Sequence, residues 1–324
     1  MGGLPGLRRP MQPVVAYQFL PARKPAVVRR LLAQLPAEHV VAILDLEDSA
    51  ADIIDVGRTA ELKAAARANL VAALPLGPDG NLPPLGVRVN RSSTPYHDAD
   101  LEGVAELRRR GHDVAVMLPK VESAAEVMAA ADFFACRGLA PPRFAILAET
   151  GAGVAGLSSI LSQAGTLIDA VVLGMIDYAY DQNLWPFPGP FDEELWGVAR
   201  RVADAAAEHG IRYVHTPCLQ LRDAPVIRGI RRRVAETCRG PAAMISLSLA
   251  QTRTIIMPGG EEALDGWEQR PVDPADEARG VVRRFRDNQH AKRSFSVDAA
   301  GDRYISPHEY LAAVRFLERQ GLAP

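Results

Sequence analysis

Three acidic side chains directly follow an apolar segment early in the chain. Asp45, Glu47 and Asp48 come immediately after Val40–Leu44, a run with the composition of a strand that is buried on both faces. A buried charge without a partner is strongly unfavourable, so these carboxylates are expected at the open end of a strand or facing a cation. Either arrangement indicates a functional site.

A second pair of carboxylates suggests a metal. Glu149 follows the apolar run Phe144–Leu147, and Asp177 closes the next one, Val172–Asp177. Adjacent parallel strands lie about 4.8 Å apart, so side chains at neighbouring strand ends can share one ion. Two carboxylates without His or Cys suit a hard cation such as Mg²⁺, whose other ligands are water and substrate oxygens. The alternative is that both acids cap the helices that follow.

A guanidinium interrupts an apolar strand pattern at Arg88, within Gly86–Asn90. Such a buried cation needs a carboxylate partner, which can come from the protein or from a ligand. Bidentate binding of a substrate carboxylate is one interpretation. An internal ion pair with Glu47 or Asp48 is the other, and the two are compatible.

Lys120 raises the possibility of a Schiff-base aldolase, in which a lysine amine is the nucleophile. A nucleophilic lysine is usually desolvated, whereas the acids around Lys120 favour its charged form. An ion pair with Glu122 or Glu149 is therefore the preferred interpretation.

The elements that carry these side chains alternate regularly along the chain. Apolar strand-like runs are followed by segments of helical period, in about eight units of roughly 25–30 residues each. This alternation predicts a parallel sheet, and eight units predict a (β/α)8 barrel with its active site at the C-terminal ends of the strands. A doubly wound open sheet is disfavoured, because the turn Leu20–Lys24 contains none of the glycines that such folds carry there. The strands are expected at Val14–Leu20, Val40–Leu44, Leu85–Val89, Val114–Leu118, Phe144–Leu147, Ala170–Leu173, Tyr213–Thr216 and Ala242–Leu247.

The pattern divides the chain into three parts. Residues 1–13 are expected to be a flexible tail, residues 14–258 the catalytic barrel, and residues 259–324 a C-terminal arm. In the arm we expect a charged helix over Pro274–Gln289, a hairpin over Ser294–Ile305 and a closing helix over Pro307–Arg319. Such an arm can act as a lid, contact a neighbouring subunit or simply cap the barrel.

The composition is that of an ordinary globular protein. The 324 residues are 48% hydrophobic with a formal net charge of −2, which argues against nucleic acid as the main partner. No apolar run has the roughly 20 residues of a membrane-spanning helix. The three cysteines are far apart, which suggests free thiols in a reducing cytoplasm.

Five motifs follow the predicted strands in order: Leu44–Asp48, Val87–Asn90, Leu118–Ser123, Ala148–Gly151 and Gly174–Asp177. Together they resemble those of the citrate lyase beta-subunit-like family within the HpcH/HpaI aldolase group. The resemblance implies a barrel that binds Mg²⁺ (Mn²⁺ being an alternative) and cleaves or forms carbon–carbon bonds through an enolate. It also implies a small carboxylate substrate, either a 2-oxo or 3-hydroxy acid or an acyl-CoA, and a homo-oligomer, commonly a trimer or hexamer, whose arm reaches a neighbouring subunit.

Site roles follow from the positions of these motifs. The resemblance implies Glu149 and Asp177 as metal ligands, and Glu47 and Asp48 as catalytic acids that support the metal water and the arginine. Arg88 is expected to bind and orient the substrate carboxylate. Lys120 and Gly174 are expected beside the substrate.

The chain also departs from the family at three positions. The usual Ile-His-Pro segment is Ile245-Ser246-Leu247, the arm's acid before a proline is Ser306, and a histidine of the other aldolase branch is replaced by Ser49. Thioester chemistry is therefore in doubt. Two further functions stay open: an accessory relative that binds an acid ligand, and a phosphoenolpyruvate-type transferase.

Overall fold

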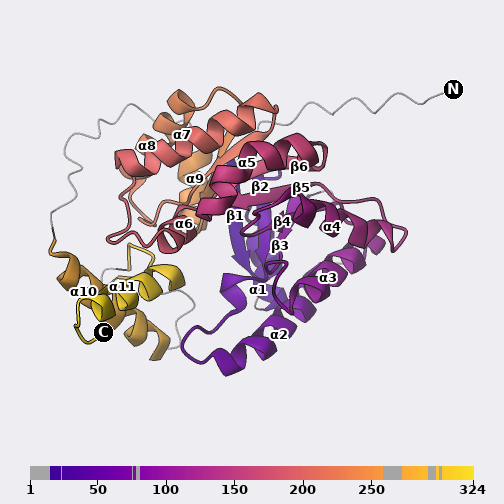
Figure 1. Cartoon of the computed structure of the whole chain (residues 1–324). Helices are drawn as coiled ribbons and strands as arrows, with labels where there is room; N and C mark the ends of the chain where they lie inside the picture. Colours follow the sequence, from indigo (N-terminus) through magenta and orange to yellow (C-terminus); the bar gives the residue numbers. More distant parts are fainter. Residues whose placement is uncertain are drawn as a thin grey trace.

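The structure, a computed structural model, describes residues 15–22, 24–74, 76–77, 81–257, 272–290, 297–298 and 301–324. Eight parallel strands close into a barrel in the order β1 to β8, with helices packed around it (Figure 1). The predicted (β/α)8 fold is confirmed. The strands are β1 (Ala16–Pro21), β2 (Val40–Asp45), β3 (Leu85–Arg88), β4 (Val114–Leu118), β5 (Phe144–Ala148), β6 (Ile168–Leu173), β7 (Arg212–His215) and β8 (Ala242–Ser246).

The helices follow the strands as expected, with one addition. The short helix α6 begins directly after β6, so Asp177 lies in the first turn of a helix and not at the end of a strand, as the sequence pattern had suggested. The helices are α1 (Pro25–Leu32), α2 (Thr59–Ala73), α3 (His97–Arg109), α4 (Ala124–Ala135), α5 (Gly151–Ala164), α6 (Met175–Asp181), α7 (Glu193–Glu208), α8 (Ala224–Thr237), α9 (Leu249–Ile256), α10 (Pro274–His290) and α11 (Pro307–Arg319), with short 3₁₀ turns at Asp48–Ala50, Val56–Arg58 and Gly165–Leu167.

The strands alternate between two apolar clusters. The larger cluster joins one face of each strand to the surrounding helices, and a smaller one, which consists of strand residues such as Ile43 and Leu147, fills the barrel interior. Because side chains alternate along a strand, Asp45, Arg88 and Glu149 have the same parity as the interior residues. All three therefore point into the barrel at its C-terminal end.

The C-terminal arm packs against its own barrel. Figure 1 shows α11 beside α6 and α10 packed against α11, and a separate apolar cluster joins the two arm helices. The indole Nε1 of Trp185 donates to the carbonyl of Pro274 at 3.0 Å, and Arg315 Nη1 donates to Asn183 Oδ1 at 2.7 Å. The structure describes a single chain, so the expected contact with a neighbouring subunit stays a prediction.

The predicted hairpin is described in part. Val297 pairs with Tyr304 in an antiparallel bridge, whereas Ser294–Ser296 lie outside the described residues, as does the predicted tail of residues 1–13. Arg303 forms a second antiparallel bridge with Gln220 of the barrel. This pairing brings the segment that precedes α11 to the mouth of the barrel. None of the helices in the described part of the chain has the length and apolar character needed to cross a membrane.

Candidate active site

A cavity opens at the C-terminal end of the barrel, beneath the arm. Strand ends form one side of it and the segment before and within α11 forms the other. The lining includes six residues that the sequence had suggested, together with two arm residues: Asp45, Asp48, Arg88, Glu149, Gly174, Asp177, Ser306 and His308. Glu47 and Lys120 are not among the lining residues but pair with members of this group: Glu47 lies 2.9 Å from Arg88, and Lys120 lies 2.7 Å from Asp177. The structure thus brings the predicted residues together, although their roles stay predictions.

Arg88 is held by carboxylates of its own chain. Its Nε and Nη2 atoms donate to the two oxygens of Asp45 at 2.7 and 2.9 Å, and Nη1 lies 2.9 Å from Glu47 and 3.2 Å from Asp48. Its guanidinium also stacks over the ring of Phe19, 4.9 Å from the centroid. Burial lowers the pKa of Arg88, but the three acids outweigh that effect and raise it. The internal ion pair is therefore the arrangement present in the structure.

Asp45 also shapes the loop that carries the other two acids. Its oxygens accept the backbone N–H groups of Glu47 at 3.0 Å and of Ser49 at 2.9 Å. The ammonium of Lys63, on α2, donates to the carbonyls of Leu46 and Glu47 at 3.0 and 2.6 Å. These hydrogen bonds fix the loop that places Glu47 and Asp48 beside Arg88.

Lys120 forms the second cationic centre. Its Nζ atom lies 2.7 Å from Asp177 Oδ1, 3.2 Å from Glu47 Oε1 and 4.0 Å from Glu149 Oε1. Its backbone is left-handed, with φ of 51°, a conformation that is uncommon outside glycine and recurs at functional sites. Burial lowers the pKa of Lys120, but Glu149 and the other carboxylates outweigh it and raise the pKa overall.

A charged ammonium is a poor Schiff-base nucleophile, so this chemistry does not fit Lys120. The expected partner Glu149 is present. The other expected partner, Glu122, pairs with Arg91 instead, with 2.7 Å between Arg91 Nη2 and Glu122 Oε2. The lysine is directed inward toward the acids while Glu122 stays at the surface.

Glu149 is the most buried acid of the site, with 1% of its surface exposed. Its Oε1 atom accepts the backbone N–H of Lys120 at 2.8 Å. Burial, and then the charge of Asp177, raise the pKa of Glu149 well above its ordinary value. The side chain of Thr150, not that of Glu149, caps α5, because Thr150 Oγ1 accepts the N–H of Gly153 at 3.0 Å. The helix-cap alternative thus fails for Glu149.

Gly174 makes room for that glutamate. A Cβ atom at this position would lie 2.5 Å from Glu149 Cβ and closer still to Glu149 Oε2, nearer than real side chains approach. The loop between β6 and α6 therefore requires a residue without a side chain here, so that Glu149 can pass over it.

Replacing Gly174 by Ala is expected to displace the Glu149 carboxylate and to weaken binding of a divalent cation by about tenfold, because ligand geometry must be held closely for metal binding. Isothermal titration with Mn²⁺ measures the change. The matched control is Gly103→Ala on α3, where a new Cβ meets only Leu70 Cδ2 at 3.9 Å. The assignment is wrong if both variants bind Mn²⁺ as the unchanged protein does.

The site carries more acid than the cations beside it can neutralise. Five carboxylates surround two cations in these contacts: Asp45, Glu47, Asp48, Glu149 and Asp177 against Arg88 and Lys120. Burial, and then the charge of Asp48, raise the pKa of Glu47, so its ionised form is disfavoured in this site. Glu47 Oε2 and Asp177 Oδ1 are also buried without a hydrogen bond, although cations lie near both. This oxygen-rich, electron-rich donor set fits a hard divalent cation.

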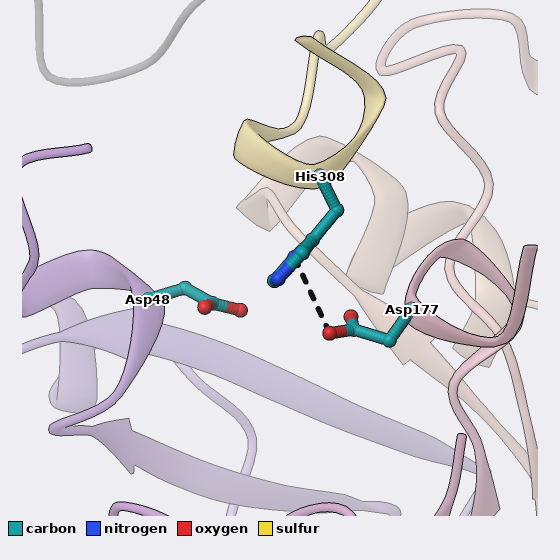
Figure 2. A group of neighbouring side chains, drawn as sticks. All are labelled: Asp48, Asp177 and His308. Atoms are coloured by element: carbon teal, nitrogen blue, oxygen red, sulfur yellow. Dashed lines mark ion pairs between the residues drawn. The ribbon is translucent and has the colours of Figure 1, made fainter. Parts of the chain in front are cut away.

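His308 is the site residue that the sequence reasoning missed. It lies in the first turn of α11, and its Nδ1 atom is 3.2 Å from Asp177 Oδ1 (Figure 2). The motif of the arm pointed to the residue before Pro307, which is Ser306. This residue is the helix cap, because Ser306 Oγ accepts the N–H of Glu309 at 3.0 Å. The signal available in the sequence was a histidine two residues beyond that cap.

Ser246, another of the departures, and the buried His215 both lie on the outward face of their strands, away from the cavity. Ser246 has the outward parity of β8, and its Oγ pairs with Thr252 Oγ1 at 2.7 Å and donates to Gln18 Oε1 at 3.2 Å. His215, also outward, stacks on Trp196 with 4.8 Å between the ring centroids, and burial lowers the pKa of His215 to about 3. Neither position supplies a group to the barrel interior.

Comparison with known protein families shows which family has this fold and these motifs. The HpcH/HpaI aldolase/citrate lyase family profile matches residues 16–238, which is more than half of the chain. The chain belongs to the HpcH/HpaI aldolase/citrate lyase family. The resemblance carried by the five motifs is confirmed. A comparison with curated proteins gave no match.

Several solved structures share the fold of this chain. The citrate lyase beta subunit from M. tuberculosis, complexed with oxaloacetate and magnesium, is 23% identical over 75% of this chain and 95% of its own, with a TM-score of 0.56. RipC from Yersinia pestis is 24% identical, covering 75% and 93%, with a TM-score of 0.55. Haloferax volcanii malate synthase, a pyruvate/acetyl-CoA ternary complex, is 18% identical over 96% and 92%, with a TM-score of 0.70.

Proposed function

We propose that this family member is a magnesium-dependent carbon–carbon lyase that acts on a small carboxylate substrate through an enolate. The observation that supports it most strongly is the group of five carboxylates around two cations at the mouth of the barrel. We assign Glu149 and Asp177 of this group as the metal ligands. A similar barrel, the M. tuberculosis citrate lyase beta subunit, has been solved with oxaloacetate and magnesium. Family membership, donor chemistry and position in the fold all agree with this function.

A divalent cation bound here supplies positive charge that stabilises the negative charge developing on a substrate enolate oxygen. Arg88 presents a guanidinium fixed by Asp45 at the cavity wall, where it attracts and orients a substrate carboxylate. Lys120 holds Glu149 and Asp177 in place through its ammonium and its backbone N–H. The arm covers the cavity and limits the access of water.

Glu47 and Asp48 are the candidates for moving a proton. Burial raises the pKa of Glu47, so this carboxyl can exchange a proton closer to neutral pH than an ordinary glutamate. Burial also acts to raise the pKa of Asp48, but Arg88 and other cations lower it overall, so Asp48 stays an anion. Glu47 therefore suits acid/base work, whereas Asp48 suits orientation of Arg88 and of bound water.

A second candidate is the reverse type of reaction, condensation of a 2-oxo acid with an acyl-CoA. It is favoured by the malate synthase from Haloferax volcanii, because the similarity covers 96% of this chain and thus includes the arm. The cap residue Ser306 offers no carboxylate for that chemistry. We therefore rank the lyase first.

The expected result is metal-dependent cleavage of one member of a panel of 3-hydroxy acids and their CoA esters. The full-length protein is stripped with a chelator and then assayed with Mg²⁺ or Mn²⁺ for release of pyruvate, oxaloacetate, glyoxylate or acetyl-CoA. Cleavage without added metal would contradict the proposal. Tight binding of an acid ligand in calorimetry without turnover would identify an accessory protein, and a phosphate requirement would indicate a phosphoenolpyruvate-type transferase.

A further inference from the structure

We infer that His308 of the arm is a metal ligand, which joins Asp177 and Asp48 in a mixed nitrogen and oxygen site that favours Mn²⁺ over Mg²⁺. The inference rests on the metal of the proposed function and adds two donors to it, His308 and Asp48, since Asp177 belongs to both groups. It also gives the arm a role. The arm, packed over the mouth of the barrel, would complete the coordination of the ion with its imidazole.

The geometry of the three donors carries this inference. In the described part of the chain, Asp48, Asp177 and His308 form a group of metal-binding side chains whose donor atoms all lie within 4.8 Å of one another. Metal–ligand bonds of about 2.0–2.2 Å place neighbouring donors roughly 3 Å apart and opposite donors roughly 4.2 Å apart. Figure 2 shows the imidazole and both carboxylates pointing toward a common space. A small inward movement is enough to coordinate one ion.

The three donors come from elements that are fixed independently. Asp48 begins the turn after β2, Asp177 lies in the first turn of α6, and His308 lies in the first turn of α11. The start of α11 is anchored by an ion pair with a buried carboxylate, in which Arg303 Nη2 lies 2.6 Å from Glu309 Oε1. The imidazole therefore reaches the mouth of the barrel from a fixed backbone, which is how a metal ligand is preorganised.

The Oδ1 atom of Asp177 has capacity to bind a metal ion. Asp177 Oδ1 is buried without a hydrogen bond and faces both His308 and Lys120. When an ion binds this oxygen, Lys120 keeps Glu47 at 3.2 Å and Glu149 at 4.0 Å as partners. Binding thus exchanges one ion pair of the lysine for a coordinate bond without leaving the ammonium unpaired.

The donor set determines the preferred metal. Mg²⁺ binds almost entirely through oxygen, whereas imidazole suits transition metals and the affinity of a mixed site rises along the first row. A site of carboxylates and one imidazole is therefore expected to bind Mn²⁺ more tightly than Mg²⁺ by at least about tenfold. A site of carboxylates alone would discriminate less.

The test is pulsed electron spin echo spectroscopy of the full-length protein loaded with one equivalent of Mn²⁺. We expect echo modulation from a directly coordinated imidazole nitrogen, its loss in His308→Gln, and its retention in the control His209→Gln at the end of α7. Calorimetry should show Mn²⁺ binding about tenfold weaker in His308→Gln, with Mg²⁺ binding nearly unchanged. Circular dichroism establishes that both variants are folded.

Other outcomes overturn the inference. Bound Mn²⁺ without nitrogen coupling would reduce His308 to an ion-pair partner of Asp177, and coupling that persists in His308→Gln would place another histidine at the ion. Failure to bind Mn²⁺ at all would remove the site. None of these readouts needs turnover, so an inactive but nitrogen-coordinating protein would refute the lyase and leave the role of His308 intact.

Discussion

Replacing Glu149 by Gln is expected to lower metal-dependent turnover by about 100-fold or more and to weaken Mg²⁺ binding in parallel. The amide keeps the shape of the side chain, its passage over Gly174 and an oxygen that can accept the N–H of Lys120. It removes only the negative charge. A large loss would therefore arise from the charge that attracts the cation and not from altered packing.

The same variant should fold at least as well as the unchanged protein when metal is absent. Burial and Asp177 raise the pKa of Glu149, so the folded state resists its ionisation. A carboxyl with a raised folded-state pKa contributes most stability below its unfolded pKa and loses that contribution as pH rises through the folded value. A neutral amide avoids this loss at neutral pH. Denaturant unfolding in a chelator, compared with unfolding in Mg²⁺, measures both effects.

Glu122→Gln is the matched control, since Glu122 belongs to a neighbouring strand end but pairs at the surface with Arg91. Its activity and metal affinity should remain close to those of the unchanged protein. Full Mg²⁺-dependent activity in Glu149→Gln would show that Glu149 is not a ligand. Reduced stability in the chelator would show that its buried charge is compensated better than we infer.

The barrel could be predicted from the sequence because each of its strands is buried on both faces. Such strands read as continuous apolar runs, and the charged residue that ends a run marks the mouth of the barrel, as at Asp45 and Glu149. Strand parity then decides which side chains enter the interior. The same reasoning explains why Ser246 faces outward, although the spacing of the motif alone could not show it.

The arm could not be placed in this way. Its position depends on long-range contacts, such as the bridge between Gln220 and Arg303 and the packing of α11 on α6, that leave no local pattern in the sequence. His308 was missed for that reason. Asp177 was assigned to a strand end because the apolar run continues through Met175 and Ile176, which in the structure begin a short helix. The period of the hydrophobic pattern alone cannot distinguish a buried strand from a short buried helix.

Replacing Arg88 by Met should destabilise the protein by about 3–5 kcal/mol, because removal of one partner leaves buried charges uncompensated. The guanidinium is the shared partner of Asp45, Glu47 and Asp48, and methionine retains much of its apolar length without any charge. Urea denaturation at neutral pH measures the loss. Arg91→Met, which breaks the surface pair with Glu122, is the control and should cost less than about 1 kcal/mol.

The loss of stability caused by Arg88→Met should become smaller at acidic pH. Arg88 is the largest of the influences that lower the pKa of Asp48 against the opposing effect of burial, so without the arginine burial raises that pKa. The acids of the variant then take up protons in the folded state, and its stability deficit shrinks as pH falls from neutral. Adding Asp45→Asn to Arg88→Met should restore part of the stability at neutral pH. The contrary result is a stability deficit that is small, independent of pH and unaffected by Asp45→Asn. It would mean that Arg88 contributes mainly through packing against Phe19, and that its charge does not stabilise the three acids at the mouth of the barrel.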